Sequence, residues 1–176
     1  MKPRGLLMIE HRLIEKVLSV VQQKALSMTE MDYHPAFVET IVDFIKTYAD
    51  RTHHGKEEDI LFAALAKKKL DDDHLCIMKE LIDEHQKARS KTKEIVELNE
   101  KFKNGDRRVV PAITTAMIWL AGFYPAHIRK EDALFFPGTE SYFQQDELDG
   151  LLGRFYEFDR MMIHEKYQKM YLAIRS

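Results

Sequence analysis

The sequence contains a single cysteine, Cys76, among 176 residues. One cysteine excludes an internal disulfide, a thiolate-rich zinc site and a cysteine-ligated iron–sulfur cluster in a single chain. Any bound metal is therefore expected to have nitrogen and oxygen ligands. Glycine and proline are also scarce, with seven and five residues. No segment shows the two-residue alternation of a half-buried strand, and helical periodicity dominates, so an all-α fold is predicted.

The chain also lacks a charge excess and long apolar runs. Lysine plus arginine number 27 and aspartate plus glutamate number 29, which leaves no basic surface typical of nucleic-acid binding. No run of about 18 uninterrupted apolar residues is present, so no membrane-spanning helix is expected. Near the N-terminus, charge at Glu10 interrupts the short apolar run before it could act as a secretion signal, so a cytoplasmic location is expected.

The apolar periodicity predicts four helices in one compact domain. The first covers residues 6–28, and the second follows a turn at residues 29–35 and ends near residue 69. The third begins at the acidic residues 71–73, and the fourth follows the Asn104-Gly105-Asp106 break and is closed by Pro137-Gly138. Residues 1–140 are therefore expected to form a four-helix bundle. The first helix has an apolar seam that also contains His11: Leu7, Ile14, Leu18, Val21 and Ala25.

A fifth amphipathic helix is expected within residues 141–176. Its apolar stripe consists of Leu148, Leu151, Leu152, Phe155, Phe158, Met162 and Tyr167. An apolar stripe of this length has to be buried, either on the bundle or against another protein. The helix is therefore expected either to pack on its own bundle or to bind a second copy of the chain, as a homodimer, or another protein.

A nine-residue phrase occurs twice, from His54 to Phe62 and from His127 to Phe135. In each copy a histidine precedes a glutamate by four residues, which places both side chains on one face of an α-helix. His54 with Glu58, and His127 with Glu131, are therefore candidate pairs of metal ligands. Two such pairs predict two metal ions.

The repeat extends to the first and third helices. His11 and His85 are separated by 74 residues, and the two phrases by 73, so each half offers one single histidine and one His-x-x-x-Glu pair. Such a set suits a dinuclear centre in a four-helix bundle. The predicted metal ligands are His11, His54, Glu58, His85, His127 and Glu131.

The same four-residue spacing also joins His11 to Glu15 and His53 to Glu57, so the spacing alone does not select the ligands. Glu15 corresponds to Arg89 in the other half and is interpreted as a surface charge. His53 is one residue out of register with His54, and it is expected at the rim of the site or in solvent. The remaining histidines, His34, His74 and His164, are interpreted as structural or surface residues.

A purely structural role for these histidines and glutamates is the alternative to metal binding. A single seam histidine is usually a core imidazole with a hydrogen-bond partner. Burying two unpaired carboxylates costs several kcal/mol each, however, so four histidines and two glutamates inside a bundle favour bound cations. Imidazole and carboxylate ligands suit iron, manganese or zinc, and iron best explains a paired site open to small molecules.

With this set, the chain resembles the hemerythrin family, specifically its HHE cation-binding branch, over roughly residues 5–138. The resemblance implies a four-helix bundle with two iron ions, a probable oxo or hydroxo bridge, and Glu58 and Glu131 as bridging ligands. Leu81 stands where the oxygen-carrying members have a further histidine. Glu131 stands where they have an aspartate ligand, and the adjacent Asp132 is an alternative carboxylate.

The leading functional hypothesis is a non-haem di-iron protein that binds or senses O₂, NO or peroxide. Its first alternative is a di-iron oxidoreductase that consumes peroxide or NO. In that case Tyr124, almost one turn before His127, is a candidate proton or hydrogen-bond donor, although an aromatic on an apolar seam is usually a core residue. A second alternative is an iron-responsive interaction module, in which metal occupancy changes the exposure of the C-terminal helix to a partner.

Overall fold

The structure is a computed structural model that describes residues 2–175, and along the last helix it describes the side chains up to Met162 and that of Lys166. Every regular element in this range is helical, which confirms the predicted all-α fold. The elements are α1 (Pro3–Ser27), α2 (Pro35–Phe44), η1 (Ile45–His54), η2 (Glu57–Phe62), α3 (Ala63–Leu65), α4 (Asp72–Lys103), η3 (Arg107–Val109), α5 (Val110–Lys130), η4 (Glu131–Phe135), α6 (Phe136–Thr139), η5 (Glu140–Tyr142) and α7 (Gln145–Arg175).

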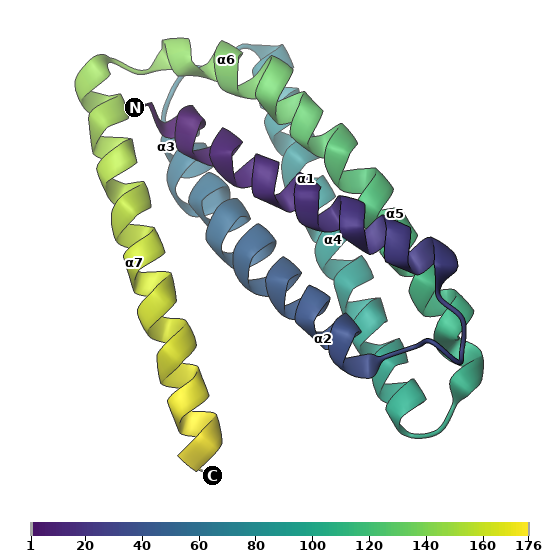
Figure 1. The fold of residues 1–176 in the computed structure, drawn as a ribbon. Helices are drawn as coiled ribbons and strands as arrows, with labels where there is room; N and C mark the ends of the chain where they lie inside the picture. The colour runs from purple at the N-terminus through teal and green to yellow at the C-terminus, as the bar shows by residue number, and fades with distance from the viewer. Residues whose placement is uncertain (1, 176) are drawn as a thin grey trace.

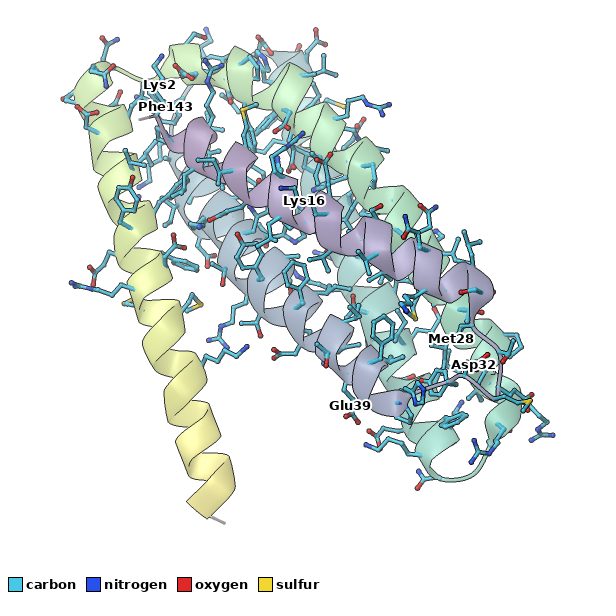
Figure 2. All side chains as sticks on the ribbon, viewed as in Figure 1. Lys2, Lys16, Met28, Asp32, Glu39 and Phe143 are labelled. Atoms are coloured by element: carbon cyan, nitrogen blue, oxygen red, sulfur yellow. The ribbon has the colours of Figure 1, made fainter. Side chains whose placement is uncertain are left out.

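Four long helical rods form an up-and-down bundle (Figure 1). The second rod runs from α2 through η1 and η2 to α3, and the fourth runs from α5 through η4 and α6 to η5. Helix α5 packs against both α1 and α4, and α2 packs against α4. Met28 and Asp32 lie at one end of the bundle, while Lys2 and Phe143 lie at the other (Figure 2).

Local sequence signals fix the ends of the third rod. The carboxylate of Asp71 accepts a hydrogen bond from the backbone N–H of His74 at 2.7 Å, which caps the N-terminus of α4. At the other end, Gly105 has a φ of 100°, a left-handed conformation that favours glycine. Both the acidic helix start and the Asn-Gly-Asp break were therefore predicted correctly.

The apolar core has two parts, and the histidines lie between them. One cluster packs around Ile14, Ala49 and Tyr124, and the other around Leu81 and Phe135. All five predicted seam residues of the first helix are buried. A site enclosed above and below by apolar layers has a low local dielectric, so charges within it interact strongly.

Helix α7 packs on the bundle along α1, η1 and η2. Phe155 is completely buried, and Leu148 and Leu151 join the cluster around Leu81. The apolar stripe of the first half of α7 is therefore covered by its own chain. The predicted stripe residue Tyr167, like His164, lies outside the described side chains.

One helical stretch, Arg107–Tyr142, is long and apolar enough to cross a membrane by length and composition, although no uninterrupted apolar run was found in the sequence. The core helix of a soluble protein passes the same test. Here the stretch contains α5, whose inner face packs in the bundle against α1 and α4. The test therefore adds only weak evidence for a membrane span.

Candidate metal centre

Five histidines and two glutamates meet in the middle of the bundle. His11 comes from α1, His53 and His54 from η1, His85 from α4, and His127 from α5; Glu57 begins η2 and Glu131 begins η4. Each of these seven residues is at most 2% exposed. All four rods therefore contribute to one buried polar centre.

The five imidazoles are all held in the same way, by a carboxylate at Nδ1. Each Nδ1 lies within hydrogen-bond distance of a carboxylate outside the centre, which fixes the ring and leaves Nε2 directed at the other histidines and glutamates. The pairs are His11 with Asp132 (2.7 Å), His53 with Glu10 (2.9 Å), His54 with Asp50 (3.3 Å), His85 with Glu58 (2.6 Å) and His127 with Glu84 (2.8 Å).

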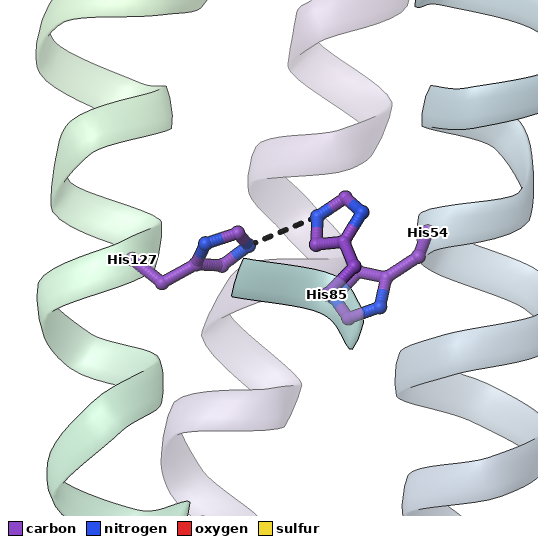
Figure 3. A group of neighbouring side chains, drawn as sticks. All are labelled: His54, His85 and His127. Carbon is purple, nitrogen blue, oxygen red and sulfur yellow. Dashed lines mark hydrogen bonds between the residues drawn. The ribbon is translucent and has the colours of Figure 1, made fainter. Parts of the chain in front are cut away.

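The first of two ligand groups is the three-histidine cluster, formed by His54, His85 and His127 (Figure 3). One nitrogen from each residue lies within 4.8 Å of the others. His85 Nε2 and His127 Nε2 are 3.2 Å apart. The rings of His54 and His85 are stacked with centroids 3.8 Å apart. Three imidazoles arranged in this way can face one cation.

The second group is the mixed cluster, formed by His11, His53, Glu57 and Glu131, whose ligand atoms also lie within 4.8 Å of one another. His11 Nε2 is 3.1 Å from Glu131 Oε2, and His53 Nε2 is 3.3 Å from Glu57 Oε1. Two imidazoles and two carboxylates form a second position that can hold a cation.

Both glutamates lie between the two clusters. Glu57 directs Oε1 to His53 and places Oε2 3.5 Å from His85 Nε2. Glu131 directs Oε2 to His11 and places Oε1 3.3 Å from His127 Nε2. Each carboxylate therefore offers one oxygen to each cluster, which is the arrangement needed to bridge two metal ions.

The backbone at the centre is π-helical, at η1, η2 and η4. A π-helix has a wider turn than an α-helix and often marks a functional site. In the second rod the inward-facing positions recur every four residues: Ile45, Ala49, His53, Glu57, Leu61 and Leu65. This spacing keeps His53 and Glu57 on the buried seam over several turns.

The structure does not place Glu58 in either cluster. Its side chain is 25% exposed, it accepts a hydrogen bond from His85, and it forms an ion pair with Arg89 at 2.8 Å. Glu57, one residue earlier, occupies the inward position because the seam follows the four-residue spacing. The expectation that Glu58 lies inside with His54 was therefore wrong.

His53 is also placed differently from the expectation of a rim or solvent position. It is 1% exposed and belongs to the mixed cluster, whereas His54 belongs to the three-histidine cluster. Two consecutive histidines thus serve the two sides of the centre. The other four predicted residues, His11, His85, His127 and Glu131, all lie in the clusters, and Asp132 lies outside them against His11.

The family model of the hemerythrin HHE cation binding domain matches residues 3–139. The chain belongs to the hemerythrin HHE family. The chain is accordingly a metal-binding protein, and domains of this type typically bind iron. The match covers the first three rods, the fourth rod to the end of α6, and all seven residues of the two clusters, and η5 and α7 lie beyond it. Comparisons with curated proteins and with solved structures gave no significant match.

The donor atoms of this HHE centre fit the cations that the family binds. Among the described residues, Nε2 of His11, His53 and His54 and both carboxylate oxygens of Glu57 and Glu131 are buried and face one another without the geometry of a hydrogen bond. An unsatisfied buried carboxylate is costly, and a divalent cation between these atoms removes that cost. The residues present therefore fit metal ions.

In the metal-free HHE centre, protons bound to histidines offset part of the negative charge of the carboxylates. Burial alone would lower the pKa of His11, but its carboxylate neighbours Asp132 and Glu131 raise it to about 9. Burial acts in the same way on His127, whose pKa Glu131 and Glu84 raise to about 10. Burial and the adjacent His85 lower the pKa of His54 well below its usual value.

These pKa values predict how the metal-free protein responds to pH. A histidine whose pKa is raised on folding stabilises the fold below its unfolded pKa of 6.5, and the stabilisation is lost as pH rises through the folded value. The melting temperature of the chelated protein should therefore fall between pH 6.5 and 9.5. Bound metal replaces those protons, so the loaded protein should show a smaller fall; parallel melting curves for the two forms would contradict this prediction.

A cavity of about 80 Å³ lies beside the three-histidine cluster and is lined by residues that include Asp50, His54, Arg89 and Tyr124. The guanidinium of Arg89 donates to Asp50 at 2.7 Å, next to the cavity. The Tyr124 hydroxyl is buried and has no partner among the described residues. The HHE centre therefore has an adjacent space large enough for a small molecule, with one free hydroxyl beside it.

Proposed function

We propose that this HHE protein is a non-haem di-iron protein that binds or senses O₂, NO or peroxide. One observation carries the proposal: Glu57 and Glu131 each direct one carboxylate oxygen to each of the two ligand clusters. Two cations bridged by two carboxylates lie about 3.5 to 4 Å apart in such centres, close enough to share one small ligand.

In this proposal the three-histidine cluster would hold one iron and the mixed cluster the other, and Glu57 and Glu131 would offer one oxygen to each. Leu81 stands where oxygen-carrying members of the family have a further histidine, and here His54 would supply that third imidazole beside His85 and His127. The three-histidine cluster would then offer five donor atoms and the mixed cluster four, because each glutamate directs one oxygen to each side. The mixed cluster thus offers fewer donor atoms, whereas the cavity of about 80 Å³ lies beside the three-histidine cluster. Manganese and zinc, which accept the same donor types, are the alternative metals.

Oxidoreductase chemistry with peroxide or NO is the alternative function, and the Tyr124 hydroxyl favours it. Burial raises the pKa of Tyr124, so the phenol stays protonated and can donate a hydrogen bond. Bound iron would supply electrons and ligand positions, while Tyr124 would orient a small molecule that enters the neighbouring cavity. A third function, iron-responsive interaction with a partner protein, has its candidate surface on α7.

The test is the iron content and optical spectrum of anaerobically purified protein, before and after addition of O₂, NO and peroxide. We expect about two irons per chain and near-ultraviolet bands that change with the ligand. Reversal on ligand removal supports binding or sensing, and decay with consumption of peroxide and an added electron donor supports an oxidoreductase. Unchanged spectra with all three ligands would contradict both and leave the interaction module.

Tyr124→Phe separates the two chemical functions. The variant keeps the aromatic ring and removes the hydroxyl. If the hydroxyl donates to a substrate, turnover of peroxide or NO should fall by about 100-fold, the range for a positioned proton donor, with iron content unchanged. For a binding protein the variant should keep its ligand spectrum. Tyr156→Phe, the same change at an exposed tyrosine of α7, is the control.

A further inference from the structure

A fully buried lysine lies next to the centre. Lys56, between η1 and η2, is 0% exposed, and its Nζ contacts the carboxylates of Glu10 and Asp159, the latter at 2.6 Å. A buried ammonium group is costly unless it is paired and hydrogen-bonded. Lys56 is therefore fixed by one carboxylate of α1 and one of α7.

This contact continues to a ligand nitrogen. Glu10 uses one oxygen for Lys56 and the other for Nδ1 of His53, at 2.9 Å. Both oxygens of Glu10 therefore have a partner, as a buried carboxylate requires. An unbroken chain of polar contacts therefore runs from Asp159 through Lys56 and Glu10 to His53.

The other half of the bundle contains the same set without α7. Lys130 contacts Glu84, and Glu84 accepts a hydrogen bond from His127, as Glu10 does from His53. Lys130 takes its second carboxylate from Glu80 of α4, at 3.0 Å, and its side chain is 24% exposed. The two halves thus differ in that Asp159 of α7 stands where Glu80 stands in the second half.

Helix α7 is also held closely at this position. A Cβ on Gly55 would lie 2.8 Å from Cζ of Phe158, so the absence of a side chain at Gly55 lets α7 approach the second rod. Phe155, one turn earlier on α7, is completely buried. The packing of Phe155 and Phe158 on the bundle therefore holds Asp159 against Lys56.

We propose that α7 positions one metal site: Asp159, through Lys56 and Glu10, holds His53 in the orientation that the mixed cluster requires. The three-histidine cluster does not depend on α7 in this way. The carboxylates that contact its Nδ1 atoms, those of Asp50, Glu58 and Glu84, all belong to the bundle. The inference rests on the proposed function in that both clusters hold metal. By thermodynamic reciprocity, metal in the mixed cluster also stabilises the docked position of α7.

The experiment compares wild type, Asp159→Asn and the control Asp149→Asn, an equal change at an exposed residue of α7. Each protein is titrated with Co²⁺ against a competing chelator, and hydrogen exchange of α7 is measured with and without Co²⁺. In Asp159→Asn one of the two metals should bind more weakly, by up to about 10-fold, the lower end of the range for a direct outer partner such as Glu10. Asp159→Glu should restore part of the affinity.

The second readout separates positioning from general stability. Metal-free Asp159→Asn should melt below metal-free wild type, because buried Lys56 keeps Glu10 but loses the charge of Asp159. Co²⁺ should nevertheless protect α7 in wild type and in Asp149→Asn more than in Asp159→Asn. Two unchanged affinities in Asp159→Asn, with two metals in wild type, would overturn this inference and leave the proposed function intact. Fewer than two metals in wild type would overturn the proposed function, and this inference with it.

Discussion

Glu57→Gln is expected to abolish binding of two metals, whereas Glu58→Gln should retain both at saturating metal. Glu57 is fully buried and offers one oxygen to each cluster, so a neutral amide in its place removes a ligand from both metals at once. Glu58 only accepts a hydrogen bond from the outer nitrogen of His85. For Glu57→Gln we expect the metal affinity to fall by more than about 100-fold. For Glu58→Gln we expect a fall of about 10- to 100-fold, the range for residues that contact a ligand from outside.

The second half of the bundle provides a matched pair for the same measurement. Glu131→Gln should behave like Glu57→Gln, and Asp132→Asn like Glu58→Gln, because Asp132 lies against the outer nitrogen of His11. Iron content after anaerobic loading, and the affinity in competition with a chelator, give the result for all four variants. Equal losses at positions 57 and 58 would refute the assignment of Glu57 as the bridging ligand.

Removal of metal is expected to lower the melting temperature by roughly 8 to 16 °C for each site that was saturated. A ligand present at about 1,000 times its Kd stabilises the folded state by about 4 kcal/mol, and a protein of this size gains about 2 to 4 °C per kcal/mol. The physical source is the set of unpartnered atoms of Glu57, Glu131 and the histidines, which metal satisfies. Thermal melting of the loaded and chelated protein at pH 7 measures the difference.

Restoring the metal is the control for this prediction. Iron added back under anaerobic conditions should return the melting temperature to that of the loaded protein. Hydrogen exchange should show the largest protection at η1, η2 and η4, which carry four of the seven cluster residues: His53, His54, Glu57 and Glu131. A melting temperature unchanged by chelation, after verified loss of metal, would show that these buried residues are satisfied without cations.

The helices and most of the core were predictable because they depend on local periodicity. The seam of α1 was predicted residue by residue, and every residue of it is buried. The inward position of Glu57 in place of Glu58 was not predicted, because α-helical spacing fits both His53 with Glu57 and His54 with Glu58. The four-residue seam of a π-helical rod, which decides between them, is a property of the backbone that the sequence pattern did not reveal.

A signal in the sequence could nevertheless have selected Glu57. His11 and His85 are 74 residues apart, and the same offset relates His53 to His127 (127 − 53 = 74) and Glu57 to Glu131 (131 − 57 = 74). The pairing of His54 with His127 needs an offset of 73 and breaks this register. A constant offset is the stronger criterion because both halves build the same centre.

Other features of the centre required the three-dimensional structure. His54 has no counterpart histidine in the other half, so no repeat indicated that it completes a group with His85 and His127. The contact between Lys56 and Asp159 joins residues 103 positions apart, on a helix outside the repeat. Such contacts depend on how α7 packs across the bundle, and amphipathic periodicity alone does not determine that packing.

The most direct test of the central claim is X-ray absorption spectroscopy at the iron edge on the anaerobically loaded wild-type protein, with the iron content measured on the same sample. The account predicts about two irons per chain, nitrogen and oxygen ligands, and an iron–iron distance of about 3.5 to 4 Å or shorter with a single-atom bridge. One iron per chain, or two irons with no iron–iron contribution to the spectrum, would contradict a carboxylate-bridged pair between the two clusters.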